Sequence, residues 1–223
     1  MIQLQGKQFI DLSHVEEGNM PVDPALQLPR LDFFSRVGNG TQIHNLEVIS
    51  YCPHTGTHID APFHVNSQWG TVETVDPTVL IGPATVVSLQ VPEYDYEVTK
   101  EDFINWEKEH GVIPEGDGVL LHTGHADKWS KGNPEYIDKG YVHLALSGAE
   151  YLVERKVRFI GMESISVDGA PTDCHKMLLG HGVFIVENLC NLEKIGQIHC
   201  YTVGTFPAVK GGSGTWTRLL ALV

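Results

Sequence analysis

The sequence predicts a sheet-rich α/β domain, and three observations predict it. The chain has 223 residues, which is long enough to bury a substantial core and lies within the range of a single domain. Short runs of β-branched residues recur along it, and fewer amphipathic stretches open with helix-capping residues. We therefore expect one domain that covers residues 1–223.

The predicted strands are short, well separated and rich in β-branched residues. Their number exceeds that of the helices, which favours a sheet as the centre of the fold. They are His44–Ser50, Ala84–Gln90, Val119–His122, Arg158–Met162, Val183–Glu187, His199–Thr205 and Trp216–Val223.

Three helices are predicted from their start and stop signals. The first runs from about Thr99 to His110, where a Thr-x-x-Asp opening precedes an apolar face. The second runs from Ser147 to about Lys156, where Ser-x-x-Glu predicts a capping box with Glu150. The third runs from about Thr172 to Leu179, with Thr172 as a cap and Gly180 as a stop. The longest loops are expected at 18–40 and 123–141, and we regard both as candidates for substrate contact or subunit packing.

The charge of the chain argues against two classes of partner. Its formal net charge is -13, whereas nucleic acids and anionic lipid surfaces are bound by clustered Lys and Arg. The first residues lack the basic start and apolar run of an export signal, and no later stretch has the ~18 apolar residues that span a bilayer. We expect no nucleic-acid or membrane partner and a cytoplasmic location.

The four cysteines do not form a Cys-x-x-Cys pair, and four in a chain of this length do not make a disulfide scaffold. Reduced thiols that pack as small hydrophobic side chains are the expectation. These residues are Cys52, Cys174, Cys190 and Cys200.

Histidines are concentrated in the segment from His54 to His64, His-Thr-Gly-Thr-His-Ile-Asp-Ala-Pro-Phe-His. His54, His58, Asp60 and His64 follow one another at spacings of four, two and four. Imidazole and carboxylate together suit Zn²⁺, and carboxylate-rich mixtures also suit Mn²⁺ and Fe²⁺. The pattern predicts a catalytic rather than a structural metal site, because a structural site favours Cys.

The backbone of this segment must bend for its side chains to share an ion. Residues four apart in a strand are separated by roughly 13 Å, too far for two imidazoles to bind one metal. Gly56 lies between His54 and His58 and permits the bend, while Pro62 limits regular structure toward His64.

A second cluster of polar residues lies between His175 and Glu187. Glu187 ends an apolar strand, where a buried carboxylate is costly unless a metal or cation compensates its charge. A surface Glu at a strand end explains the pattern equally well. His175 falls on the third helix, and a helix-cap or surface role is the preferred interpretation for His181.

At these residues the sequence resembles the Putative cyclase family, which includes bacterial kynurenine formamidase and isatin hydrolase. That family is marked by His-x-Gly-Thr-His-x-Asp-x-Pro-x-His, and the match at 54–64 is complete. Weaker likenesses extend over most of the chain. They are Asp11-Leu-Ser-His14 with Met20-Pro21, Leu80-Ile-Gly-Pro83, Thr123-Gly124, Ser166-Val-Asp168, Phe206-Pro207 and the last strand with Arg218.

The resemblance implies a fold, a site and an assembly. The fold is a compact β/β/α domain of the swivelling type, with a central mixed sheet or barrel and a few flanking helices. One or two divalent ions, zinc favoured over manganese, are bound by His54, His58, Asp60, His175 and Glu187, with Asp60 able to bridge. His64 matches the catalytic histidine, and homodimers or homotetramers are expected.

The expected activity is hydrolysis of a small amide, formamide, lactam or lactone, most similar to that of an arylformamidase. An isatin hydrolase-like activity, or that of another cyclic amide or ester hydrolase, is the alternative, since Glu163-Ser-Ile-Ser departs from the family's Asp-Thr-Pro-Ser-like run. An Fe(II) oxygenase with two His and one carboxylate is a remote alternative that leaves His54, His64 and Glu187 without roles. A non-catalytic metal-binding module is the other.

Overall fold

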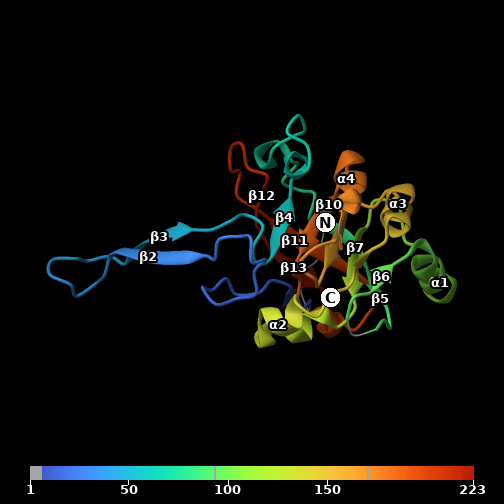
Figure 1. Ribbon diagram of the computed structural model, residues 1–223, viewed down its shortest axis with the longest axis horizontal. Coiled ribbons are helices and arrows are strands. Elements are labelled where there is room, and N and C mark those ends of the chain that lie inside the picture. The colour runs from blue at the N-terminus through green and yellow to red at the C-terminus, as the bar shows by residue number, and fades with distance from the viewer. Residues whose placement is uncertain (1–6, 93, 170) are drawn as a thin grey trace.

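A computed structural model describes residues 7–92, 94–169 and 171–223 of the chain. Residues 1–6, on which the expectation about an export signal rests, lie outside this range. The predicted α/β class is confirmed, because a curled nine-stranded sheet is flanked by a few helices (Figure 1). Among the described residues, no helix has the length and hydropathy to cross a bilayer.

The large sheet is mixed, with the strand order β1-β13-β11-β5-β7-β9-β10-β4-β12. Neighbours from β5 to β10 are parallel, and the outer pairs are antiparallel. Its strands are β1 Phe9–Asp11, β4 His58–Asp60, β5 Gly82–Ser88, β7 Gly118–His122, β9 Phe159–Met162, β10 Phe184–Glu187, β11 His199–Thr205, β12 Gly214–Trp216 and β13 Arg218–Leu222. Two smaller sheets pair β2 Arg30–Ser35 with β3 Leu46–Ser50 and β6 Glu97–Val98 with β8 His143–Leu144.

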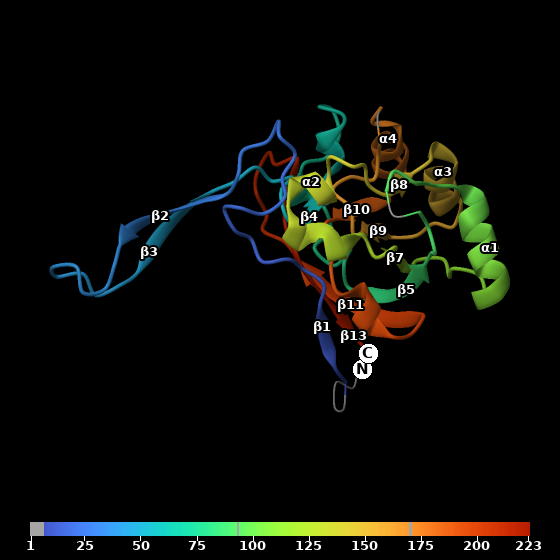
Figure 2. The same cartoon turned by 60° about the horizontal axis from the view of Figure 1, so that its bottom comes forward.

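Two hydrophobic cores lie on opposite faces of this sheet. On one face the helices α1 Lys100–His110, α3 Leu146–Glu154 and α4 Asp173–Gly180 pack through residues such as Phe103, Leu152 and Leu178. The other core lies within the curl and includes Ile59 and Phe159. Figure 2 shows the three helices together on the side away from β1 and β13. The remaining helices are short: α2 Asn133–Tyr136, and the 3-10 turns η1 Pro62–His64, η2 Val72–Thr74, η3 His125–Lys131 and η4 Leu192–Ile195.

The predicted helices are all present, but their caps differ from the expectation. Thr99 caps α1 in a capping box with Asp102, as the sequence predicts. The capping box predicted at Ser147 is wrong, because α3 begins one residue earlier, at Leu146, and Ala145 is its N-cap. Thr172 precedes α4 without a side-chain hydrogen bond to the helix, and Gly180 is its last residue.

All seven predicted strands have counterparts, although the last is divided between β12 and β13. The expectation of long loops at 18–40 and 123–141 is wrong in part. Residues 30–35 form β2, and 125–131 with 133–136 form η3 and α2. The adjacent Phe33 and Phe34 break the alternation by which a strand is recognised from sequence.

A two-stranded arm projects from the body of the molecule (Figures 1 and 2). It consists of β2, β3 and the turn between them, residues 30–50. Beyond β3 the chain runs into the segment that begins at His54. Tyr51 fixes this connection to β12. Its ring stacks on that of Trp216 with 3.7 Å between the ring centroids, and its hydroxyl oxygen lies 3.3 Å from Thr215 Oγ1.

Candidate metal centre and active site

A sharp turn at Gly56 brings the two halves of the histidine-rich segment together. Gly56 has φ +62°, a conformation that side-chain-bearing residues rarely adopt. The Glu16 carboxylate packs where a Cβ would stand and accepts a hydrogen bond from Thr57 N at 3.1 Å. The chain then continues into β4, so the predicted bend between His54 and His58 is present.

Strand pairing places a carboxylate from a distant part of the chain beside β4. In the antiparallel ladder between β10 and β4, Glu187 stands opposite His58, and opposed residues share a face of the sheet. Asp60 lies two residues from His58 and therefore on the same face. All three side chains are buried. Glu187 is thus a buried carboxylate rather than a surface residue at a strand end.

His175 reaches the same point from the first turn of α4. Its Nδ1 lies 2.5 Å from Asp168 Oδ2, and Asp168 also accepts hydrogen bonds from the backbone N–H groups of Cys174 and His175. These contacts fix the ring so that Nε2 faces Asp60 and Glu187. His58 is oriented in the same way, because its Nδ1 lies 2.8 Å from the carbonyl oxygen of Gly56.

Four side chains converge at one point, with equal separations between their atoms. His58 Nε2 lies 3.4 Å from Asp60 Oδ1 and 3.4 Å from Glu187 Oε2. His175 Nε2 lies 3.4 Å from Asp60 Oδ2 and 3.4 Å from Glu187 Oε1. Despite this proximity, His58 Nε2 and Asp60 Oδ2 are buried and have no hydrogen-bond partner.

This donor set fits a divalent metal. Two ligand atoms each about 2.1 Å from a tetrahedral Zn²⁺ lie about 3.4 Å apart, as these atoms do. Buried polar atoms without hydrogen bonds are costly, and a cation between them would satisfy both. Each imidazole also directs its other nitrogen to an outer oxygen, an arrangement common to metal-binding histidines.

The charges of the cluster act strongly on one another. Burial lowers the pKa of His58, but the neighbouring Asp60 and Glu187 carboxylates outweigh it and raise that pKa to about 10. Burial raises the pKa of Asp60, whereas the imidazoles of His175, His54 and His58 hold it well below its usual range. Two buried carboxylates thus require positive charge beside them, which a divalent cation would supply in place of protons.

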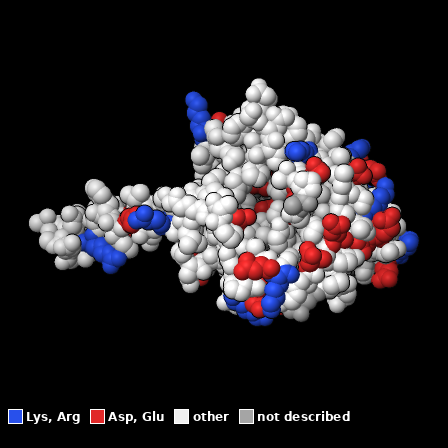
Figure 3. Space-filling model, viewed as in Figure 1, with Lys and Arg blue, Asp and Glu red and all other residues white. Residues whose placement is uncertain are grey.

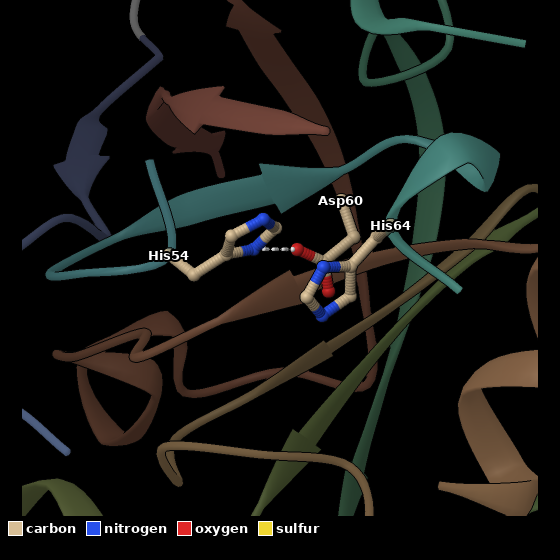
Figure 4. Close-up of side chains that lie close together, drawn as sticks. All are labelled: His54, Asp60 and His64. Atoms are coloured by element: carbon tan, nitrogen blue, oxygen red, sulfur yellow. Dashed lines mark hydrogen bonds and ion pairs between the residues drawn. The ribbon is translucent and has the colours of Figure 1, made fainter. Parts of the chain in front are cut away.

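His54 and His64 lie at the open side of the cluster. His54 Nδ1 is 2.7 Å from Asp60 Oδ1, and its Nε2 is 2.8 Å from Ser213 Oγ. Figure 4 shows the His64 ring beside the Asp60 carboxylate, and its centroid is 3.8 Å from that of His54 in a stacked arrangement. His64 is exposed on its outer side, and partial burial lowers the pKa of its imidazole.

Asp60 belongs to two groups of three possible metal ligands. Within each group, the donor atoms lie within 4.8 Å of one another. One consists of His54, Asp60 and His64, and the other of His58, Asp60 and Glu187. All six predicted site residues are therefore brought together, since His175 also faces Asp60. The shared carboxylate is geometrically able to serve both groups.

Other polar residues around the site were not assigned roles from the sequence. Asp168 and Ser213 orient His175 and His54, yet each is joined to its partner only by the tertiary fold. Glu163 is buried and accepts hydrogen bonds from the backbone N–H groups of residues 123–125, which fixes the loop after β7. Asp168 belongs to the family-like run Ser166-Val-Asp168, and Glu163 opens the run that departs from the family pattern, but neither run indicates which side chain its residue contacts.

His181 and the cysteines lie outside the cluster. His181 is exposed at the end of α4, and its Nδ1 lies 2.7 Å from the carbonyl oxygen of Met177. This position agrees with the helix-cap or surface role preferred from the sequence. All four cysteines are free thiols; Cys174, Cys190 and Cys200 are buried, and Cys52 is half-buried.

Comparison with known proteins gives a consistent result. The model of the Putative cyclase family matches residues 10–169, which include the 54–64 segment but end before His175 and Glu187. Kynurenine formamidase from Bacillus cereus is 33% identical over 150 residues, which span 65% of this chain and 65% of that enzyme. Kynurenine formamidase from Delftia acidovorans is 27% identical over 196 residues, 86% of each chain.

Among solved structures, isatin hydrolase A from Labrenzia aggregata, bound to benzyl benzoate, superimposes with a TM-score of 0.88 at 26% identity. The similarity covers 97% of this chain and 94% of that one. It therefore extends through α4 and β10, which the family model does not reach. The matched family model and this common fold show that the chain belongs to the Putative cyclase family.

Proposed function

We propose that this protein is a metal-dependent hydrolase that cleaves a small formamide or cyclic amide. The observation that carries the proposal is the convergence of His58, His175, Asp60 and Glu187, whose facing atoms are 3.4 Å apart. His54, His58, Asp60, His175 and Glu187 are the proposed metal ligands. Zinc is favoured over manganese as the bound ion. One or two ions per subunit are proposed, because Asp60 faces His58 and His175 and its Oδ1 also lies 2.7 Å from His54 Nδ1.

In the proposed reaction, water adds to the carbonyl carbon, the C–N bond breaks and a carboxylic acid and an amine are formed. A divalent ion at this centre would lower the pKa of water and polarise the scissile carbonyl. His64 accepts a proton from the attacking water and delivers it to the leaving nitrogen, a role typical of imidazole. Its position beside the ligands and its exposed outer side give substrate access to it.

The residues around the centre keep these groups in place. Asp168 holds the His175 ring, the Gly56 carbonyl holds His58, and Ser213 holds His54. Preoriented ligands avoid rearrangement during the reaction, which favours catalysis. The exposed position of His64 also argues against a non-catalytic metal-binding module, because a site closed by protein ligands would leave substrate no access to the centre.

Kynurenine formamidase and isatin hydrolase among the relatives support two candidate substrates, N-formylkynurenine and isatin. We favour the arylformamidase-like activity, with the isatin-hydrolase-like activity as the second candidate. An Fe(II) oxygenase is disfavoured because it would leave three converging residues, His54, His64 and Glu187, unused.

A substrate panel tests this proposal. Protein purified without added metal is analysed for bound elements and then assayed under anaerobic conditions with N-formylkynurenine, isatin and a simple lactone. Turnover that is abolished by a chelator and restored by Zn²⁺ or Mn²⁺ would support a metal-dependent hydrolase. Activity that requires O₂ and a 2-oxo acid would instead identify an oxygenase, and bound metal with no turnover on the panel would support a binding module.

We further propose a cytoplasmic location, a homodimeric or homotetrameric assembly and a single domain. Four free thiols suit a reducing compartment. Strands β1 and β13, from opposite ends of the chain, are paired in one sheet, which supports one domain over residues 1–223. A small molecule is the expected partner of the site. The net charge of -13 disfavours nucleic acid and anionic membranes.

A further inference from the structure

Asn188 directly follows the proposed ligand Glu187 and has a left-handed backbone, with φ +57°. Asparagine adopts this conformation more readily than most residues with a side chain. The residue is 2% exposed, so its polar groups require partners inside the protein. Its N–H donates to the Ser164 carbonyl oxygen at 3.0 Å, and its own carbonyl oxygen accepts from Thr57 Oγ1 at 2.6 Å. Backbone contacts therefore hold Asn188 beside the centre.

The side-chain amide of Asn188 shares an acceptor with a proposed metal ligand. Its Nδ2 donates to the carbonyl oxygen of Gly56 at 2.8 Å, and the same oxygen lies 2.8 Å from Nδ1 of His58. A carbonyl oxygen has two lone pairs and can only accept, so these two N–H groups fill it. His58 therefore carries a proton on Nδ1 in this contact, and Nε2 is the nitrogen that can bind a cation. Asn188 thus fixes the oxygen that orients His58.

Tyr136, a fully buried residue of α2, sets the orientation of the Asn188 amide. Its hydroxyl lies 2.8 Å from Asn188 Oδ1 and 2.5 Å from the carbonyl oxygen of Glu163, and both oxygens accept its proton. Burial raises the pKa of Tyr136 well above its usual value, so the hydroxyl keeps that proton. If the amide turned over, Oδ1 would face the Gly56 carbonyl oxygen with no proton between them. The contact with Tyr136 therefore keeps Nδ2 directed at Gly56.

The charge of the centre favours an uncharged residue for this task. The ion pairs that Asp60 and Glu187 form within the described part of the chain are all with imidazoles. In Figure 3, acidic side chains are visible inside a hollow near the middle of the view, whereas Lys and Arg side chains lie outside it. A lysine or arginine beside His58 would repel a divalent ion. An amide holds the Gly56 carbonyl by hydrogen bonding and adds no net charge.

We propose that Asn188 is a positioning residue, whose amide holds the Gly56 carbonyl in place and through that oxygen orients His58 for metal binding. Tyr136 keeps the amide in the required orientation. This role rests on the proposed function, since His58 needs such positioning as a ligand. Contacts that orient metal-binding histidines contribute about 10–100-fold to metal affinity or activity. Because Asn188 acts through His58, its loss should lower metal affinity and kcat rather than raise KM.

Asn188→Gly and Asn191→Gly are matched variants. Both positions have left-handed φ, +57° and +61°, which glycine adopts without strain, so the backbone keeps its path. Each variant loses an Nδ2 that donates to a backbone carbonyl oxygen, that of Gly56 at 2.8 Å or that of Asp11 at 2.7 Å. The amide of Asn191 thus holds β1 rather than the turn before β4. A general loss of stability would appear in both variants.

Metal affinity separates positioning from stability. Competition with a chromogenic chelator gives the affinity for Zn²⁺, and urea unfolding of the metal-free proteins gives the stability. We expect Asn188→Gly to bind Zn²⁺ about 10–100-fold more weakly than Asn191→Gly at a similar loss of stability. Equal affinities of the two variants, with Zn²⁺ bound by wild type, would overturn the proposal alone. Wild type that binds no metal would overturn the proposed function as well.

The Nδ1 proton of His58 gives a readout that needs neither metal nor turnover. In ¹⁵N NMR spectra of metal-free wild type, its hydrogen bond to Gly56 should slow exchange with solvent, and the signal is assigned by its loss in His58→Gln. Exchange should be faster in Asn188→Gly and unchanged in Asn191→Gly. A structural role elsewhere, or an action through Glu187, would not move this proton. Equal exchange in all three proteins would therefore contradict the proposal.

Tyr136→Phe tests the second half of the assignment. It keeps the ring and removes the hydroxyl that contacts Asn188 Oδ1, so the amide becomes free to turn. It should weaken Zn²⁺ binding and speed exchange of the His58 proton in the wild-type background, with no further effect on either in Asn188→Gly. Effects of equal size in both backgrounds would show that Tyr136 does not act through Asn188 and would overturn its role.

Discussion

At the scale of single residues, the site depends on what each imidazole does with its second nitrogen. His58 and His175 use Nδ1 to contact oxygen atoms outside the centre, and this leaves Nε2 free to face Asp60. The sequence could predict the ligands in 54–64, because their spacing is local. It could not identify Asp168 or Ser213, because the hydrogen-bonding contacts they make with His175 and His54 arise only when separate segments fold together.

Replacement of Asp168 by Asn should weaken metal binding without unfolding the protein. The carboxylate that orients His175 would be lost, and such outer contacts contribute about 10–100-fold to metal affinity. Competition with a chromogenic chelator measures the change. Asp173→Asn serves as the control, since Asp173 lies on α4 with His175 but is exposed and pairs with Lys176. Equal affinity in wild type and Asp168→Asn would contradict the orienting role.

His125 should make stability depend on pH. Burial lowers its pKa from 6.5 to about 4, so the unfolded chain takes up a proton first as the pH falls. The contribution of His125 to the free energy of unfolding is therefore full above about pH 6.5 and lost as the pH falls toward 4.

Urea unfolding of wild type and His125→Gln at pH 7 and pH 4.5 tests this dependence. The stability advantage of wild type should shrink at the lower pH, by an amount of up to about 2–3 kcal/mol. The exposed His181→Gln controls for the loss of an imidazole. A wild-type advantage that is unchanged or larger at pH 4.5 would contradict the buried, neutral state of His125.

At the scale of elements, local sequence signals predicted which segments form strands and helices better than they predicted the residues at which these elements begin and end. The Thr99 capping box is present because Asp102 stands at the position that closes it. The similar signal at Ser147 fails, since Ala145 and not Ser147 is the N-cap of α3. Strands of two or three residues, such as β1, β6 and β8, are too short for a periodic pattern and were not predicted.

The turn before β4 should be more sensitive to a side chain than other glycine turns. Gly56→Ala would meet the Glu16 carboxylate in addition to the strain of φ +62°. Gly116→Ala is the matched control, with φ +82° and no atom within 4 Å of the added Cβ.

Backbone strain alone costs of the order of 1 kcal/mol in both variants, and Gly56→Ala should lose more because of the contact. Urea unfolding and metal content measure the difference. Equal losses would show that Glu16 gives way freely and that the packing at the turn contributes little.

At the scale of the whole molecule, topology brings the site together. Asp60 and Glu187 are distant in sequence but adjacent through the antiparallel pairing of β4 with β10. In the sheet, β10 lies at the end of three parallel pairs, β5 with β7, β7 with β9 and β9 with β10, and its other neighbour is β4. Local sequence patterns do not indicate which strands become neighbours, so this strand order could not be predicted. The family resemblance implied that His175 and Glu187 are metal ligands. The residue pattern alone did not decide whether Glu187 is a buried ligand or a surface residue at a strand end.

The most direct test of metal-dependent hydrolysis with His64 as the proton carrier is turnover per bound metal ion in wild type and His64→Ala. His64 is proposed to move protons rather than to hold the ion, so both proteins should contain the same amount of metal. Turnover of the preferred substrate in the panel should fall about 10²–10⁴-fold in the variant. Wild-type turnover in metal-loaded His64→Ala would remove His64 from the mechanism, and full turnover by metal-free wild type would contradict metal-dependent hydrolysis itself.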